Sequence, residues 1–418
     1  MLALRLIRGS HPLVLLSRLL VACAMAGVGF LLLASLSHAL AHPGQPAASV
    51  ARLLWCLVPL AAAVQLAVAV ARTDPGPQAR SALDTVRSGP GGVPALAAVS
   101  TAVSCLLGSA VALLVFLHLR GELTGMPFDG AASGLLAADR PLPVAAALTL
   151  LCVAPVLASC TAFALSARTA RPARLRAHGG DRDRDRATME ARTVRAASSG
   201  GADTAAPATD DTTGPAPLPG SLPWGAALTA AGLALETYAS RSQHLPVPRT
   251  LEGIAPGVLG GWLLIAVGLV LAGPGLTHLC GTLLTTCRPG AVRLLAGRVL
   301  REEAARVGRP LGTLCAVVAG TLVAARLYAA APGGGLSAVG PMTALGIALV
   351  LACALLSVLT SAAEWRSARV RTNAALVRVG APRKLLRRAA ALRAAVLLVA
   401  LGSLTWALSV LASLPVLP

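Results

Sequence analysis

Few side chains in this 418-residue chain are of the types that perform catalysis or bind metals. His278, Cys280 and Cys287 lie close together in the sequence and could be imagined as metal ligands. Their spacing matches no standard zinc pattern, however, and single cysteines within apolar helices are ordinarily packing residues. We therefore expect no metal at this position.

The one lysine of the chain, Lys384, excludes an ATP-binding loop of the GxxxxGK[ST] type, because the preceding residue is Arg383 rather than glycine. Neither an HExxH nor a GxSxG sequence occurs. Glu236 is the one acid within a predicted span, and acids in spans are functional candidates by default. Because it lies near the outer end of a weakly apolar helix, we expect its side chain to reach toward water. These features predict a protein that is not an enzyme and uses no cofactor.

The composition predicts an all-α integral membrane protein. Hydrophobic residues make up 56% of the chain and charged residues only 13%, about half of the ~25% found in soluble domains. The formal net charge of +19 would suggest nucleic acid in a soluble protein. Here the arginines gather in short loops between apolar runs, and aromatic residues are only 3%, which leaves little for base stacking. We therefore expect a lipid bilayer, and no nucleic acid, as the environment of the chain.

Apolar runs long enough to cross a bilayer predict about nine transmembrane helices. They cover residues 19–41, 51–71, 93–118, 142–167, 222–238, 257–279, 310–330, 341–363 and 394–414. Residues 168–221 are polar and rich in Pro, Gly, Ser and Thr, and we expect a disordered cytosolic linker. A regulatory or anionic-lipid contact by its arginines is the alternative for this segment.

The distribution of basic residues orients these spans. With the N-terminus in the cytoplasm of a multi-pass plasma-membrane protein, most of the 36 basic residues fall on inner segments. Without the weak span at 222–238, two strongly basic segments would lie outside. We divide the chain into a first unit of four spans (1–167), the linker (168–221), two connecting spans (222–285) and a second unit of three spans (286–418). No outer segment between spans is long enough for a large extracellular domain.

The stretch 366–393 holds nine of the basic residues between two apolar runs, which end at Trp365 and begin at Ala394. Its pattern predicts a short helix, a break at Val-Gly-Ala-Pro, and a second basic helix that enters the membrane. We expect the first helix to lie on the membrane surface, where it can contact another protein.

Two pairs of segments indicate an internal duplication. Residues 2–8 match 295–301 at Leu2, Ala3, Arg5 and Arg8, and residues 80–89 match 371–380 at Arg80, Val86, Arg87 and Gly89. The two offsets differ by two residues. Both units begin inside, so we predict two parallel repeats related about the membrane normal.

The stretch 371–398 resembles the signature of FtsX-like ABC transporter permeases. The matching residues are Ala375, Leu376, Arg378, Gly380, Ala381, Arg383 and Arg387, and Arg293, Leu295, Arg298, Leu300, Arg301 and Arg309 match the helix that precedes a span in these proteins. The resemblance implies a membrane subunit that couples ATP hydrolysis by a separate cytosolic ATPase to export or extraction of an amphiphilic substrate, or to force transmission across the membrane. The resemblance also allows the chain to form a homodimer, or a heterodimer with another permease.

The resemblance assigns the coupling role to particular positions. The coupling residues would be Leu376, Arg378, Gly380, Ala381, Arg383, Lys384 and Arg387, with weaker counterparts Arg80, Arg87 and Gly89, and the lead-in helices would use Arg5, Arg8, Arg298 and Arg301. The alternative is a non-transporting membrane regulator or signalling protein that acts through the linker 168–221.

Overall fold

The computed structural model describes residues 12–73, 92–122, 130–134, 136, 138–165, 167, 221–242, 256–286, 290–330, 340–378 and 382–414. All the regular secondary structure in these ranges is helical. The helices are α2 (Pro12–Ala41), α3 (Pro46–Trp55), α4 (Leu57–Thr73), α6 (Gly92–Arg120), an unlabelled helix (Val144–Leu165), α8 (Ser221–Ser242), α9 (Pro256–Thr286), α10 (Ala291–Ala330), α11 (Pro341–Arg378) and α12 (Arg383–Ser413).

Eight helical segments of the described residues are long and apolar enough to cross a membrane, one of them (Ala48–Arg72) formed by α3 and α4 together. They include every predicted span except the weak one at 222–238, where α8 forms but falls short of that hydropathy. An all-α, multi-pass membrane protein is therefore confirmed, whereas the count of nine spans and the repeats stay predictions.

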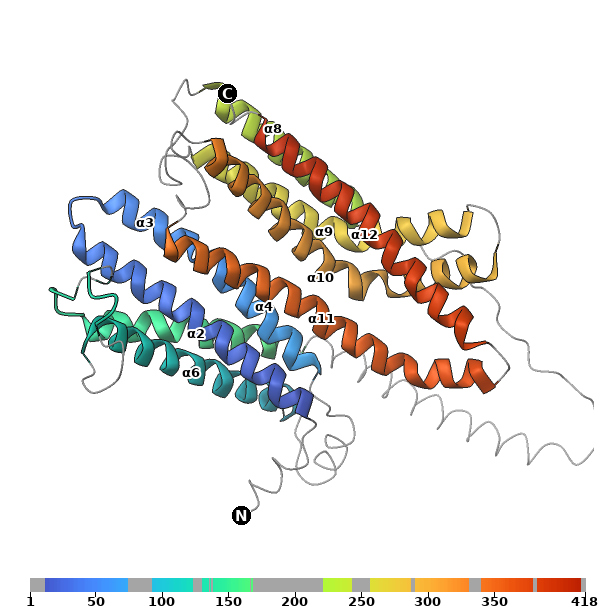
Figure 1. Ribbon diagram of the computed structural model, residues 1–418, viewed down its shortest axis with the longest axis horizontal. Coiled ribbons are helices and arrows are strands. Elements are labelled where there is room, and N and C mark those ends of the chain that lie inside the picture. Colours follow the sequence, from blue (N-terminus) through green and yellow to red (C-terminus); the bar gives the residue numbers. More distant parts are fainter. Residues whose placement is uncertain are drawn as a thin grey trace, which may run out of the picture.

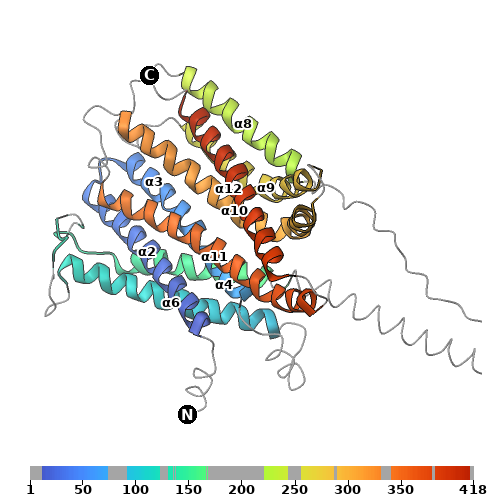
Figure 2. The ribbon, with the colours of Figure 1, turned by 45° about the vertical axis from the view of Figure 1, so that its right-hand side comes forward.

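The helices form two groups that α11 joins (Figures 1 and 2). In the first group, α2 packs against both α4 and α6; in the second, α10 packs against α9 and α12, and α8 packs along α9. On one side α11 contacts α2 and α4, and on the other it contacts α10. Its buried Cys353 lies in the same apolar core as Met25, Val28 and Leu66.

A proline interrupts the second predicted span, as its position within the apolar run predicts. Pro59 has no backbone N–H and its ring clashes with the carbonyl four residues earlier, which belongs to Trp55. The chain accordingly ends α3 at Trp55, turns at Cys56 and resumes as α4 at Leu57.

Glycine allows the closest helix contacts in the second group. A Cβ at Gly232 would lie 2.7 Å from the carbonyl oxygen of Gly261, and one at Gly308 would lie 2.4 Å from Cα of Pro274. In lipid, apolar side chains gain little by leaving their surroundings, so helices associate through such close packing. In the first group, a Cβ at Gly27 would lie 3.0 Å from Cδ1 of Leu349, and one at Gly29 would lie 2.8 Å from Cβ of Ala112. Small residues at 26–30 and 258–262 therefore allow close contacts between neighbouring helices.

Two predicted divisions of helices are wrong. The basic lead-in segment and the span at 310–330 form one helix, α10, in which Pro310 lies near the expected boundary. The expected surface helix after Trp365 is the last part of α11, which continues unbroken to Arg378. Leu, Ala and Arg favour helix on both sides of these boundaries, and α10 continues through Pro310.

Candidate coupling site at the basic end

The predicted break in the basic stretch separates α11 from α12. α11 ends at Arg378, and α12 begins at Arg383 after the N-cap residue Pro382, which has the extended angles φ −68° and ψ 132°. Proline restricts the residue before it to extended conformations, which stops the helix. Figure 1 shows that α11 and α12 meet at one end of the molecule, which we call the basic end.

Beyond Trp365, the end of α11 and the start of α12 continue past the apolar runs and diverge as a V, without packing along each other; we call these two segments the α11–α12 hairpin (Figure 1). About 13 residues of α11 and 10 of α12 belong to it, which at 1.5 Å per residue corresponds to roughly 15–20 Å of helix. Arg378, Lys384 and Arg387 are exposed there. Leu376 and Arg383 lie in the helices as predicted, Leu376 in the last turn of α11 and Arg383 at the start of α12. Gly380 and Ala381 lie outside the described residues.

Of the remaining predicted positions, only two are in the described part of the chain. Arg298 is 81% exposed on α10 and forms an ion pair with Glu302 one turn later, at 3.7 Å. Arg301 is half-buried, and its side chain lies close to Gly281 of α9. Arg5, Arg8, Arg80, Arg87 and Gly89 fall outside the described ranges, as does Cys287.

A charged cluster ties the base of the hairpin to α10. The Arg369 Nε of α11 donates to Glu303 Oε1 of α10 at 2.5 Å, and the two side chains are only 22% and 16% exposed. The guanidinium groups of Arg369 and of Arg393, which comes from α12, lie over the Trp365 ring at 4.8 and 4.5 Å from its centroid. We call these four residues the Trp365 cluster. It connects three helices through one aromatic ring and one carboxylate.

The electrostatics of the Trp365 cluster favour a single arrangement. Two positive side chains surround one negative side chain in a largely buried position, where losing either partner of an ion pair is costly. The electron-rich face of tryptophan partly compensates the second cation. Together these contacts keep α10, α11 and α12 in one register at the base of the hairpin.

A second charged contact reaches the first helix group. Glu364 of α11 interacts electrostatically with Arg72 at the end of α4 and with Arg306 of α10. Glu364 directly precedes Trp365 in the sequence. α11 therefore makes charged contacts with α4 of the first group and α10 of the second group near the same point along its length.

Sequence reasoning identified the basic hairpin but missed Glu303, Trp365 and Arg393. One signal was present. Glu302 and Glu303 are the only acids in a basic lead-in helix, Trp365 is the last residue of one apolar run, and Arg393 directly precedes the next. Their contacts join positions far apart in the chain, which a pattern along the sequence does not connect.

The expectation for Glu236 is wrong. Its side chain is fully buried between α8 and α9, and Trp262 Nε1 donates to Glu236 Oε1 at 2.7 Å. A buried carboxyl is stabilised by such a donor, and Gly261 allows the two helices to approach closely at this point. Glu236 therefore fixes α8 against α9 instead of reaching toward water.

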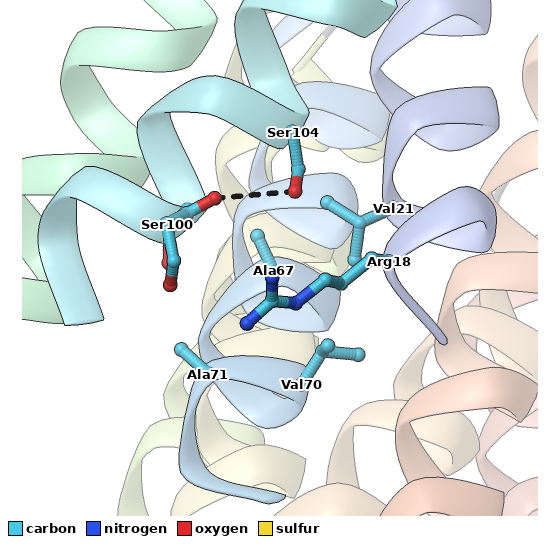
Figure 3. Close-up of a pocket in the computed structure, with 8 residues that line it drawn as sticks. Arg18, Val21, Ala67, Val70, Ala71, Ser100 and Ser104 are labelled. Atoms are coloured by element: carbon cyan, nitrogen blue, oxygen red, sulfur yellow. Dashed lines mark hydrogen bonds between the residues drawn. The ribbon is translucent and has the colours of Figure 1, made fainter. Parts of the chain in front are cut away.

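At the same end of the first helix group, the structure has a small hollow (Figure 3). Arg18 of α2 lies in it, facing Ala67 and Ala71 of α4 and the hydroxyl residues Ser100 and Ser104 of α6. Ser104 Oγ donates to the Ser100 carbonyl at 3.2 Å, a bond within one helix that joins no two elements.

Comparisons of the chain with protein-family models, with curated proteins and with solved structures found no match.

Proposed function

We propose that this chain is the membrane subunit of an ABC transporter of the FtsX-like type, and that a separate cytosolic ATPase docks on the α11–α12 hairpin. ATP hydrolysis by that subunit would drive export or extraction of an amphiphilic substrate, or transmit force across the membrane. In this proposal the chain lies in the plasma membrane with its N-terminus in the cytoplasm.

The observation that carries the proposal is the continuity between the hairpin and the spans. α11 runs from Pro341 to Arg378 without interruption, and α12 continues from Arg383 to Ser413. A displacement at the loop between them is therefore transferred along rigid helices into the membrane. A loosely attached surface helix would absorb the same displacement.

The Trp365 cluster supports the same role. Because Glu303, Arg369 and Arg393 belong to three different helices, movement of the hairpin also moves α10. The exposed basic side chains beyond the cluster, such as Arg378 and Lys384, are suited to an acidic surface on a partner.

The packing pattern is compatible with two parallel repeats. α2 contacts both α4 and α6, and α10 contacts both α11 and α12. In the proposed duplication, α4 and α11 are the equivalent second spans, and these two helices pack against each other. An interface between equivalent elements is what a two-fold relation about the membrane normal produces. We include α8 as a span of this arrangement, because its glycines pair with those of α9 along its length.

A double charge reversal tests the docking role. We expect Arg378→Glu with Arg383→Glu to reduce co-purification of ATPase activity with the chain in detergent at least about tenfold, because attraction to the partner becomes repulsion. The matched control is Arg140→Glu with Arg241→Glu, which changes the same charge at exposed positions away from the hairpin. The control should retain the partner.

Unchanged co-purification in the hairpin variant would overturn the proposal. A regulator that acts through residues 168–221 gives the opposite pattern. It would keep its partner in the hairpin variant and lose it when that segment is deleted.

A further inference from the structure

The Trp365 cluster has features of a binding site for an anionic group. It holds two guanidinium groups and one carboxylate, so one positive charge is left over in a largely buried position. The nearby acids already have basic neighbours: Glu302 pairs with Arg298, and Glu364 interacts with Arg72 and Arg306. Among the described residues, no further acid balances Arg393.

Several donors in the cluster lack an acceptor. Among the residues that the structure describes, Nε and Nη1 of Arg393 and Nε1 of Trp365 are buried and have no hydrogen-bond partner. Buried donors without acceptors are costly, and a guanidinium group binds phosphate oxygens through paired, charge-assisted hydrogen bonds. Arg393 and Trp365 are only partly buried as residues, so a rotation of the Arg393 side chain would bring its donors to a ligand at the edge of the cluster.

The depth of the cluster indicates which anion it meets. Trp365 is the last residue of one apolar run, and Arg393 precedes the first residue of the next. Tryptophan concentrates at this level of membrane proteins, beside the lipid headgroups. Basic pockets between transmembrane helices at the same level bind anionic headgroups.

We propose that the Trp365 cluster binds the phosphate group of an anionic phospholipid in the leaflet at the basic end, through Arg393 and Arg369. The bound phosphate balances the unpaired charge and accepts from donors that the protein leaves without partners. This site does not require an ATPase partner and is independent of the function proposed above.

The test uses the full-length chain in detergent and measures its thermal midpoint while one additive is titrated: phosphatidylglycerol, phosphatidylcholine or inorganic phosphate. For the unmodified chain, we expect stabilisation by phosphatidylglycerol and little by phosphatidylcholine. Arg393→Gln should weaken the apparent affinity for phosphatidylglycerol roughly tenfold, because charge-assisted bonds to phosphate are lost. Arg388→Gln removes the same charge from an exposed position on α12 and should leave the affinity unchanged.

Arg393→Lys covers the case in which Arg393→Gln does not fold, because it keeps the charge but loses the planar fork that binds two oxygens. We expect it to lie between the unmodified chain and Arg393→Gln. Equal losses in the Arg388 and Arg393 variants would show general surface attraction and overturn the site, as would an unchanged affinity in both Arg393 variants. If inorganic phosphate stabilised the chain as much as phosphatidylglycerol does, with the same dependence on Arg393, the ligand would be free phosphate and the proposed lipid site would be wrong.

Discussion

The two helix groups end differently at the basic end. In the C-terminal group, α10, α11 and α12 are joined by the Trp365 cluster, beyond which the hairpin continues to Arg378. In the N-terminal group, α4 ends at Thr73, and the junction of α2, α4 and α6 holds the hollow around Arg18 and Ser104. Helices that project beyond the lipid need specific contacts to hold their angle, whereas helices that end near the headgroups do not. The proposed transmission of movement therefore falls to the C-terminal group, where charged side chains join the three helices.

The largest effect should come from removing the single acid of the cluster. We expect Glu303→Gln to lower the free energy of unfolding by roughly 2–4 kcal/mol, because Arg369 and Arg393 lose their buried counter-charge. The midpoint of thermal or denaturant unfolding in detergent measures this loss.

The control for Glu303 is a more exposed ion pair, Arg120–Glu122, at the C-terminal end of α6. Glu122 lies 3.0 Å from Arg120 but is 47% exposed, and Arg120 also donates to the Arg140 carbonyl. Glu122→Gln should cost about 1 kcal/mol or less, because an exposed pair contributes little. Equal losses in the two variants would show that the cluster is an ordinary surface pair.

Intermediate losses of stability are expected from glycine substitutions. They test whether helix packing in the two groups contributes equally to stability away from the basic end. A Cβ at Gly108 of α6 would meet the Ala22 carbonyl oxygen at 2.4 Å, and one at Gly308 of α10 would meet Pro274 Cα at the same distance. Both are backbone atoms, so we expect Gly108→Ala and Gly308→Ala each to destabilise by about 1–3 kcal/mol. The unfolding midpoints of the two variants should decrease by similar amounts.

Gly402 of α12 is the matched control, because nothing lies within 4 Å of the Cβ position. Gly402→Ala should be neutral or stabilising by up to ~1 kcal/mol, since alanine favours helix. A loss in this variant as large as in the other two would mean that helix packing does not explain their effect.

The smallest effect should come from Trp365→Phe, compared with the same substitution at Trp262. Trp365 contributes the face of its ring to two cations, and phenylalanine keeps a weaker version of that contact, so we expect a loss of about 0.5–1 kcal/mol. Trp262 donates to the buried Glu236, so Trp262→Phe should cost about 1–3 kcal/mol by leaving the carboxyl without its donor. The reverse order of unfolding midpoints would contradict the view that Trp365 acts through its ring.

Local chemistry determined much of this fold in advance. Apolar runs of sufficient length identified the crossing helices, Pro59 divided the second of them, and the Gly-Ala-Pro sequence before Arg383 separated α11 from α12. Each of these follows from side chains within a few residues of the feature. Small residues at 26–30 and 258–262 likewise indicated close packing, although not which helix would be the partner.

Tertiary structure decided what those helices do with their few charged residues. From hydropathy alone, the Glu236 carboxyl is expected to reach water. In the structure it accepts a hydrogen bond from Trp262, which lies beside it because α8 and α9 pack together. Glu303, Trp365 and Arg393 are each unremarkable in the sequence and form a cluster only where three helices meet. The sequence by itself determined which segments enter the membrane, because that depends on the free energy of each segment in lipid. Which charges are paired depends on contacts between distant segments, and the arrangement of the helices alone decided it.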